Sequence, residues 1–543
     1  MAFSAQDEKP PRSKKTKSKV IRPLGYLERY EATMMSLDLY RSSMLTCRFA
    51  IPPRFLPAGE TRDPELQEKL EQKVESAIAK IVLDHPLLRA GLRGEHKRKP
   101  VFLEVEQVDF HRHIEWRELE KAVDYEAEFL RLIRSRINTK VEQPEDASAW
   151  RMLVLRAEGQ AFLDVMFEWG HAHLDGMSAK LFHEDLIRNL NSSDLATINE
   201  FNPKTRMLAI PPSRRRDTIP SLHALCRFPI SPGWAVSTLW AELKPPALVR
   251  ADLRATWAPV KLQPYTVRYE HFGVGDGALR NILRACREHR TTLTGLVQAL
   301  AHVSFATRLT PAQARGFVSP TVVNLRPLMC RPEMQTPMYR TAGVDPKNTM
   351  ANFMTMLDHE FGTEWVDQVR AAAAAAAAAS QEQSEGEASK EKQRAALEPL
   401  IWSAAERTRA ELQKRLDEGT GNDLMGLMKF VPDYRILFKD WVKKPRQHTV
   451  ALTNLGVIDG DPVVKDGEVD ILVEASERWH IERAVFSISH ETHGAAMTIC
   501  PVAVKGKELY ISCDWQECAV DPALAEGVVA DLEEWLKFFG RQA

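Results

Sequence analysis

Cysteine is scarce in this chain, and long apolar runs are missing. The seven cysteines are an odd number without any CxxC pair, which predicts a reducing compartment where they serve as small apolar residues. No window reaches the roughly 18 apolar residues of a membrane-spanning helix, and no apolar signal peptide begins the sequence. We therefore expect a cytoplasmic protein, with peripheral contact to the endoplasmic reticulum or to lipid droplets left open.

A net charge of either sign is also missing. The 73 basic and 74 acidic residues leave a formal charge of −1, so no global field attracts nucleic acid or an anionic membrane. The 543 residues are 44% hydrophobic, enough for more than one core. This composition predicts a globular protein that recognises its partners locally and binds no nucleic acid, and we expect a monomer.

Three familiar catalytic signatures are absent or incomplete. No GxSxG nucleophile elbow is present, which argues against an α/β-type serine hydrolase. The stretch 273–277 imitates a dinucleotide fingerprint, but no second strand ending in an acid follows it. The stretch 490–493 has the wrong spacing for a zinc-binding HExxH helix, and no Cys/His cluster replaces it. We expect no metal and no bound cofactor.

The pattern of apolar, proline and low-complexity segments predicts two lobes. We expect a disordered basic tail at 1–20, an N-terminal lobe at 21–202, a proline-rich crossover at 203–263, and a C-terminal lobe at 264–543. Within the last lobe, an alanine run opens a low-complexity insertion at about 371–393, expected to be helical in part and then mobile.

Helices and strands recur in both halves without a strict βαβ alternation. The predicted fold class is α/β in the mixed α+β sense: mixed sheets with flanking helices, in two lobes around a central channel. Apolar periodicity predicts helices at 64–89, 124–138, 177–190, 278–309 with a break at 291–294, 400–443 and 521–539. It predicts strands at 101–108, 151–157, 161–170, 264–272, 448–454, 470–474, 484–490, 496–501 and 508–514.

The exit of the strand at 161–170 carries the most informative residues. One face of this strand is apolar, the other is expected to be wetter, and His171 continues the buried parity. A histidine there can accept the proton of an alcohol, while Asp175 caps the next helix and Gly176 permits a sharp turn. His173 is a weaker base candidate. The alternative is a capped helix with a structural histidine.

The HxxxDG motif His171-Ala172-His173-Leu174-Asp175-Gly176 resembles the active-site motif of the CoA-dependent acyltransferase superfamily. That superfamily includes chloramphenicol acetyltransferase, plant BAHD acyltransferases and peptide-synthetase condensation domains. Further stretches resemble the fungal alcohol acetyltransferase branch in the same chain order, over residues 22–535. They are Leu24 to Tyr30 (LGYLERY), Cys286 to His289 with Thr292 to Gly295 (TLTG), Val323 to Pro327 (containing NLRP), and Thr453 to Gly456 (TNLG).

This resemblance implies two chloramphenicol-acetyltransferase-like lobes and an enzyme that moves an acetyl or short acyl group from acyl-CoA to an alcohol. It implies His171 as general base and acetyl-CoA as co-substrate. It further implies that Asp175 is structural and salt-bridged, with Arg326 as the candidate partner and an ordinary ion pair elsewhere as the alternative. Candidates for substrate or oxyanion contact are Asn324, Arg326, Thr453, Asn454 and Ser489.

Two departures from the motifs of other branches indicate which branch of the superfamily this chain resembles. The DFGWG motif of the plant branch is missing, and Gly170 stands where condensation domains have a second histidine. Both favour a stand-alone fungal-type acetyltransferase. Three alternatives stay open: an amine acceptor, acyl transfer from a carrier protein in place of free CoA, and a catalytically silent binding scaffold.

Overall fold

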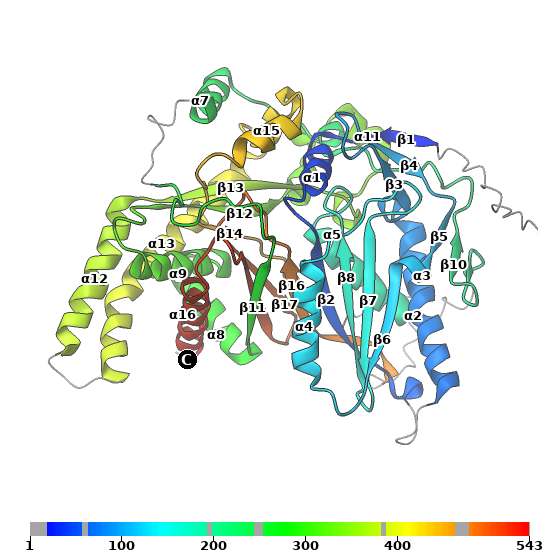
Figure 1. The fold of residues 1–543 in the computed structure, drawn as a ribbon, viewed down its shortest axis with the longest axis horizontal. Coiled ribbons are helices and arrows are strands. Elements are labelled where there is room, and N and C mark those ends of the chain that lie inside the picture. Colours follow the sequence, from blue (N-terminus) through cyan, green and yellow to red (C-terminus); the bar gives the residue numbers. More distant parts are fainter. Residues whose placement is uncertain are drawn as a thin grey trace, which may run out of the picture.

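Two lobes lie side by side in the computed structural model, each built on its own β-sheet (Figure 1). The structure describes residues 19–56, 63–192, 198–243, 253–381, 387–461 and 477–541. The predicted mixed α/β architecture is confirmed. Nearly all of the predicted basic tail and the predicted strand at 470–474 lie outside the described residues.

The N-terminal lobe contains a five-stranded sheet in the order β16-β2-β8-β7-β6, antiparallel except for the β6–β7 pair. Helices α2 and α5 pack together on one face, and α4 covers the other. The strands are β2 (Ser43–Ala50), β6 (Ile114–Leu119), β7 (Trp150–Ala157), β8 (Phe162–Trp169) and β16 (His480–Ile488). The helices are α2 (Pro64–Asp84), α4 (Tyr125–Ile137) and α5 (Gly176–Leu190).

The predicted wetter face of β8 is wrong, because both faces of this strand are covered. Asp164 and Glu168 have fully buried side chains, yet each is paired with two arginines. A buried carboxylate is tolerated when cations and hydrogen-bond donors satisfy it. The alternation of polar and apolar residues in β8 is therefore explained by ion pairing and not by contact with solvent.

The C-terminal lobe contains a larger mixed sheet in the order β11-β18-β17-β14-β12-β13, with β15 also paired to β17. Its strands are β11 (Val267–Val274), β12 (Phe317–Asn324), β13 (Met354–Phe361), β14 (Val450–Leu452), β15 (Gly456–Ile458), β17 (Met497–Val504) and β18 (Leu509–Gln516). The helices that build its core are α8 (Asp276–Glu288), α9 (Leu293–Arg308), α12 (Thr363–Gln381), α13 (Glu387–Glu418) and α16 (Pro522–Arg541).

The predicted helix break at 291–294 is confirmed. Thr292 caps α9, where its hydroxyl accepts a hydrogen bond from the Gly295 N–H at 3.3 Å. A Cβ on Gly295 would lie 2.6 Å from the carbonyl oxygen of Ala405, so this glycine lets α9 pack closely against α13. The TLTG stretch therefore serves helix capping and helix packing.

The strand predicted at 484–490 changes the lobe boundary. It is present as β16, but it pairs with β2 in the N-terminal sheet, so the C-terminal lobe is not simply 264–543. Arg483 on β16 forms an ion pair with Asp164 of β8, across β2. The periodicity of a strand predicts which of its faces are buried, but it does not predict which sheet the strand joins.

Two further predicted boundaries can be compared with the structure. The helical part expected for the insertion at 371–393 is present, because the alanine run lies inside α12, which packs on α13, and α13 begins at Glu387. Residues 382–386 lie outside the described part. The start of the predicted crossover 203–263 still belongs to the N-terminal lobe, because β10 (Met207–Ala209) pairs with β5 (Gln107–Asp109) and β9 (Phe201–Asn202).

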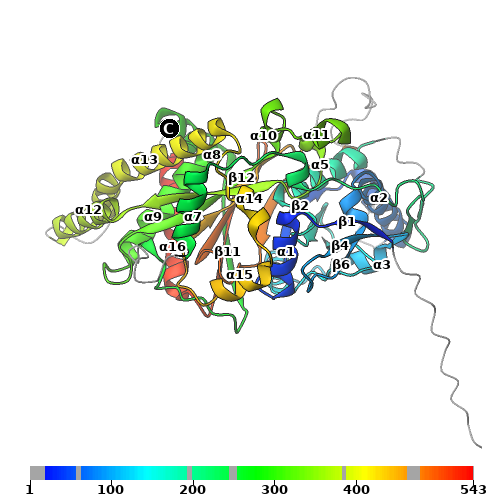
Figure 2. The ribbon, with the colours of Figure 1, turned by 90° about the horizontal axis from the view of Figure 1, so that it is seen from above.

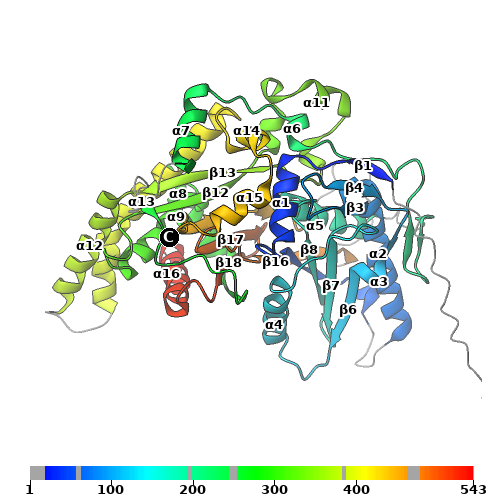
Figure 3. The same ribbon diagram turned by 45° about the horizontal axis from the view of Figure 1, so that its top comes forward.

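Helix α1 (Tyr26–Ser36) lies where the two lobes meet, against α15 (Tyr434–Trp441) (Figures 2 and 3). Tyr30 contacts the rings of Tyr434 and Phe438 there. Among the helices that the structure describes, none is long and apolar enough to cross a membrane. The remaining strands and α-helices are β1 (Val20–Pro23), β3 (Ala90–Arg93), β4 (Val101–Glu104), α3 (Phe110–His113), α6 (Leu222–Leu225), α7 (Pro232–Leu243), α10 (Arg326–Met329), α11 (Pro337–Ala342) and α14 (Leu424–Leu427).

Candidate active site

The HxxxDG motif forms the short connection between β8 and α5. Gly170 donates its N–H to the Ala149 carbonyl at 2.7 Å, and a Cβ at Gly170 would lie only 3.0 Å from that of Ala149. The chain therefore leaves the sheet tightly packed, reaches His171, and enters α5 at Gly176. This path puts His171 at the end of the N-terminal sheet where three neighbouring strands meet. There Trp169 of β8 pairs with Ser43 of β2, and Ser43 pairs with Ile488 of β16.

Asp175 is the N-cap of α5 and is saturated with hydrogen bonds. Its Oδ1 accepts from Ser178 N at 2.8 Å and from Arg326 Nη2 at 3.0 Å; its Oδ2 accepts from Arg326 Nη1 at 2.7 Å and Phe353 N at 2.9 Å. Burial alone would raise the pKa of Asp175, but the Arg326 guanidinium and these donors hold that pKa below its usual value. The side chain is therefore an ionised brace.

The ion pair expected between Asp175 and Arg326 is present, and it joins the two lobes. Both side chains are almost fully buried. Beyond the carboxylate, Arg326 Nη2 donates to the backbone carbonyls of Thr349 and Ala351 at 3.2 and 2.8 Å. Asn324 accepts from Arg326 N at 3.0 Å through Oδ1, so it shapes the turn that presents the arginine. Neither Asn324 nor Arg326 contacts His171 directly in this arrangement.

Asn352 is a site residue that the sequence analysis missed. Its neighbours Ala351 and Phe353 are both tied to the Asp175–Arg326 pair by backbone groups. Between them, Asn352 Nδ2 donates to the His171 carbonyl at 2.9 Å and lies 3.1 Å from His171 Nδ1. No motif marks this position in the sequence. It lies two residues before β13, a strand that the sequence analysis did not predict.

The His171 ring has one nitrogen enclosed by protein and one that faces no described partner. Nδ1 faces the residue's own carbonyl and Asn352, with Glu31 Oε1 at 4.0 Å. Within the described part of the chain, no hydrogen bond to Nε2 is present. The side chain is 14% exposed, and burial lowers the pKa of His171 below its ordinary value. The ring is therefore neutral at neutral pH.

His173 has a structural position. Its Nε2 lies 3.0 Å from the Ala90 carbonyl, the side chain is buried, and Phe102 packs against the ring. Burial lowers the pKa of His173 to about 4. Because the Ala90 carbonyl lies at Nε2 and the side chain is buried, His173 is set aside as a base candidate.

Gly176 and the TNLG stretch meet across the lobe boundary. A Cβ on Gly176 would lie 2.6 Å from Leu455 Cδ2, so a larger residue here would require the Leu455 side chain to move. Asn454 holds the stretch in place, because its Nδ2 donates to Thr294 Oγ1 at 3.1 Å and its Oδ1 accepts from Gly456 N at 2.7 Å. Thr453, half-buried, immediately precedes this anchored pair. Asn454 thus has a bracing position, and Thr453 is the better remaining candidate for an oxyanion donor.

Ser489 departs from the expected oxyanion position. Its Oγ accepts hydrogen bonds from the backbone N–H groups of Arg41 and Ser42 at 2.8 and 2.9 Å, and it also bonds the Tyr265 hydroxyl. A hydroxyl has two lone pairs and one proton, so these contacts use its full capacity. Ser489 anchors the loop after β16 to the segment before β2.

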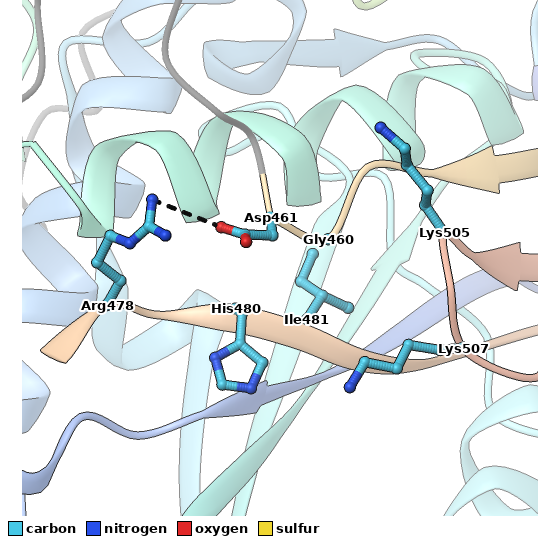
Figure 4. A pocket seen from close by; sticks show the side chains of 7 residues that line it. All are labelled: Gly460, Asp461, Arg478, His480, Ile481, Lys505 and Lys507. Atoms are coloured by element: carbon cyan, nitrogen blue, oxygen red, sulfur yellow. Dashed lines mark ion pairs between the residues drawn. The ribbon is translucent and has the colours of Figure 1, made fainter. Parts of the chain in front are cut away.

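A separate pocket of about 260 Å³ lies at the far end of β16, away from His171 (Figure 4). Arg478, His480, Lys505 and Lys507 line it together with Asp461, which pairs with Arg478. His480 is itself 3.3 Å from Glu482. This pocket contains no group placed as His171 is. Among the described residues, no cluster of histidine, cysteine and carboxylate side chains could hold a metal ion.

We predict that Asp175→Asn and Arg326→Met each lower the free energy of unfolding by about 3 to 5 kcal/mol, because each leaves one buried charge without its partner. Chemical denaturation measures this change. The matched control is Asp84→Asn, which breaks an exposed pair with Lys80 and should change stability little. Wild-type stability in both site variants would contradict the bracing role.

Comparison with known proteins finds similarity to alcohol acetyltransferases. Residues 106–318, which include HxxxDG, match the profile of the alcohol acetyltransferase family. The chain is 25% identical over 478 residues to the probable alcohol acetyltransferase FCK4 of Fusarium pseudograminearum, covering 86% of each protein. It is 20% identical over 509 residues to the probable alcohol acetyltransferase crmB of Aspergillus fumigatus, covering 92% of this chain and 95% of crmB.

Solved structures show the same fold. The TRI3 trichothecene 15-O-acetyltransferase of Fusarium sporotrichioides superposes with a TM-score of 0.64 at 12% identity, over 95% of this chain and 94% of that one. The first condensation domain of the calcium-dependent antibiotic synthetase superposes with a TM-score of 0.54 at 11% identity, over 96% and 95%. The resemblance recognised from the sequence is thus confirmed: part of the chain matches the alcohol acetyltransferase family, the curated relatives are named probable alcohol acetyltransferases, and the fold is that of TRI3 and of condensation domains.

Proposed function

We propose that this protein transfers an acetyl or other short acyl group from acyl-CoA directly to the hydroxyl of a small-molecule alcohol, with His171 as general base. The observation that carries the proposal is the neutral His171 ring with Nε2 free of described partners. A general base must be unprotonated near the working pH and within reach of the proton that it removes. No other histidine near this loop meets both conditions.

The reaction needs the neutral tautomer with its proton on Nδ1. A neutral imidazole has one N–H and one lone pair. We place the proton on Nδ1, where the residue's own carbonyl can accept it; the same carbonyl accepts from Asn352 Nδ2, whose approach to Nδ1 at 3.1 Å is then a contact between two donors and not a hydrogen bond. With the proton at Nδ1, the lone pair is at Nε2.

The reaction follows from this arrangement. Nε2 takes the proton of the alcohol as the alcohol oxygen attacks the thioester carbon, which gives a tetrahedral oxyanion. The C–S bond then breaks, and the imidazolium returns the proton to the leaving thiolate, so the products are the ester and free CoA. Thr453 is the proposed donor to the oxyanion. The transfer needs no acyl-enzyme, metal or resident cofactor.

Asp175 has no place in the proton path of this proposal. Its two carboxylate oxygens are occupied by Arg326, Ser178 and Phe353, and no hydrogen bond from His171 reaches them. The ion pair instead fixes residues 349–353, and through Asn352 it fixes the ring.

The relatives favour an alcohol as acceptor. The curated relatives are named probable alcohol acetyltransferases, and TRI3 is named a 15-O-acetyltransferase. An amine acceptor would use the same base. A carrier-protein donor is disfavoured by Gly170, which stands where condensation domains have a second histidine.

We predict that His171→Ala lowers kcat/KM for acetyl-CoA-dependent acetylation by about 100-fold to 10,000-fold, the usual contribution of a general base. Release of the CoA thiol in the presence of an alcohol acceptor measures the rate. His96→Ala, at an exposed loop position, is the matched control and should retain wild-type turnover. Full activity in the His171 variant would refute the proposed base and would revive the silent-scaffold alternative.

Asn352→Ala should lower kcat about tenfold to 100-fold with little change in melting temperature, because the ring is left without its orienting amide. Asn352→Asp should move the acid limb of the pH–rate profile upward, since a carboxylate beside His171 raises the pKa of the imidazole. Asn348→Ala, on the same segment but exposed, is the control. An unchanged pH profile in Asn352→Asp would mean that Asn352 does not act through the ring.

The acid limb of kcat/KM in the wild type should have its midpoint below about 6.5, the ordinary histidine pKa. Burial lowers the pKa of His171, so the ring stays unprotonated, and able to accept a proton, to lower pH than a free histidine. Activity should therefore persist near pH 6 and fall as the pH drops through the lowered pKa. A midpoint clearly above the ordinary value would contradict this environment.

A further inference from the structure

Helix α7 carries an apolar stripe that faces away from the protein. Val236, Leu239 and Trp240 have the spacing i, i+3 and i+4, so they share one face of the helix. The side chains of Val236 and Trp240 are 68% and 59% exposed. None of the α7 side chains that the structure describes belongs to the core of either lobe. A surface helix normally turns such a stripe toward a core, so this one indicates contact with a partner.

Hydrogen bonds join the start of α7 to the segment that leads into α14 and α15. Asn422 N donates to the Pro229 carbonyl at 2.8 Å, and Asn422 Oδ1 accepts from Ser231 N at 2.8 Å. Helices α7 and α15 lie along the upper edge of the molecule in Figure 1, and Figure 2 shows them together from above. The two helices therefore belong to one face of the molecule.

Two more apolar side chains are exposed on this face. Phe430, in the turn between α14 and α15, is 63% exposed, and Ile436 on α15 is 68% exposed. On the opposite side of α15, Tyr434 and Phe438 contact the ring of Tyr30 on α1. Because two residues of a helix differ by about half a turn, Ile436 projects away from the protein.

Lysines accompany these apolar residues. Lys439 follows Ile436 by about one turn of α15, and Lys443 follows the end of that helix. Lys429 Nζ lies 5.0 Å from the centroid of the Phe430 ring. A lysine stem of this kind can cover an apolar neighbour while its ammonium group stays in water.

The turn between β3 and β4 adds more positive charge beside α15. Arg98 Nε donates to the Pro432 carbonyl at 2.8 Å, and Lys97 and Lys99 on either side of it are exposed. The nearby acids are already paired with other cations: Glu95 with His96, Asp433 with Arg435, and Asp440 with Lys444. Within the part of the chain that the structure describes, the following lysines form no ion pair: Lys97, Lys99, Lys439 and Lys443. Their charge is therefore free to attract an anion.

We propose that this face, the α7–α15 surface, docks the protein on a membrane that contains anionic lipid. It consists of the apolar residues Val236, Leu239, Trp240, Phe430 and Ile436 and of the lysines Lys97, Lys99, Lys429, Lys439 and Lys443. With 12 residues, α7 is too short to span a bilayer, so it lies in the headgroup region with its stripe toward the acyl chains.

The residue types favour a membrane over a protein partner. Lysine is depleted in protein–protein interfaces, whereas lysines around exposed tryptophan and phenylalanine are typical of interfacial helices on anionic lipid. The whole chain has a formal charge of −1, so the attraction must come from this local group of lysines.

Flotation of the full chain with vesicles tests the surface. The wild type should bind vesicles of phosphatidylcholine mixed with phosphatidylserine and bind pure phosphatidylcholine much less. Raising the salt concentration from about 0.1 M to about 0.5 M should weaken the binding, because salt screens exposed charges. Equal binding to both kinds of vesicle, or to neither, would overturn the proposal.

Two kinds of variant assign the binding to this face. Lys439→Gln combined with Lys443→Gln should lower vesicle affinity by about 25-fold, or about fivefold for each lysine. Trp240→Ser should lower it by about tenfold or more, because less apolar area leaves water. The matched controls are Lys505→Gln combined with Lys507→Gln, and Val457→Ser, at exposed positions outside this face. They should bind like the wild type.

Every variant keeps the basic residues at 12–19, so any attraction that they add is the same in all of them. Melting temperatures should not change, since the substituted side chains are exposed. Equal losses of vesicle binding in the controls would overturn the proposal. A dimer that Trp240→Ser dissociates, formed by a wild type that binds no vesicles, would also overturn it and would assign the face to a second copy of the chain.

Discussion

The buried ion pair between Asp175 and Arg326 is the constraint on which the site depends. It fastens the start of α5 in one lobe to the turn after β12 in the other, and both side chains are nearly excluded from solvent. Such a pair contributes little when its desolvation is counted, but losing one partner is costly. Its value here is geometric. It fixes residues 349–353, and through Asn352 it fixes the ring of His171.

The candidate site is therefore formed by residues of both lobes where the lobes meet. The N-terminal lobe supplies His171, the C-terminal lobe supplies Asn352, and Leu455 packs closely against Gly176. Strand β16 and its following loop cross the same boundary, and two backbone hydrogen bonds fasten the loop to the segment after α1. A ring held from both sides keeps its orientation when substrates enter, which the proposed direct transfer between two bound molecules requires.

Local features could be predicted from the sequence, and long-range neighbours could not. The strand exit at His171, the cap at Asp175 and the helix break at Thr292 each depend on a few adjacent residues, and the structure contains them all. Two predictions failed because they depend on partners distant in the chain. The strand β16 was predicted in the wrong lobe because its partner is β2, and the second face of β8 was predicted to be wetter although arginines cover its carboxylates. Asn352 and Glu31 carry no motif, and only packing reveals that both face His171.

The central claim is that a brace built from both lobes holds His171 neutral, with its proton on Nδ1 and its lone pair on Nε2. Nitrogen NMR of the protein labelled with ¹⁵N-histidine tests this most directly, with His171→Ala to assign the signal. The account predicts a neutral His171 with Nδ1 protonated and a titration below the ordinary histidine pKa. A proton on Nε2 at neutral pH, or an imidazolium, would contradict it.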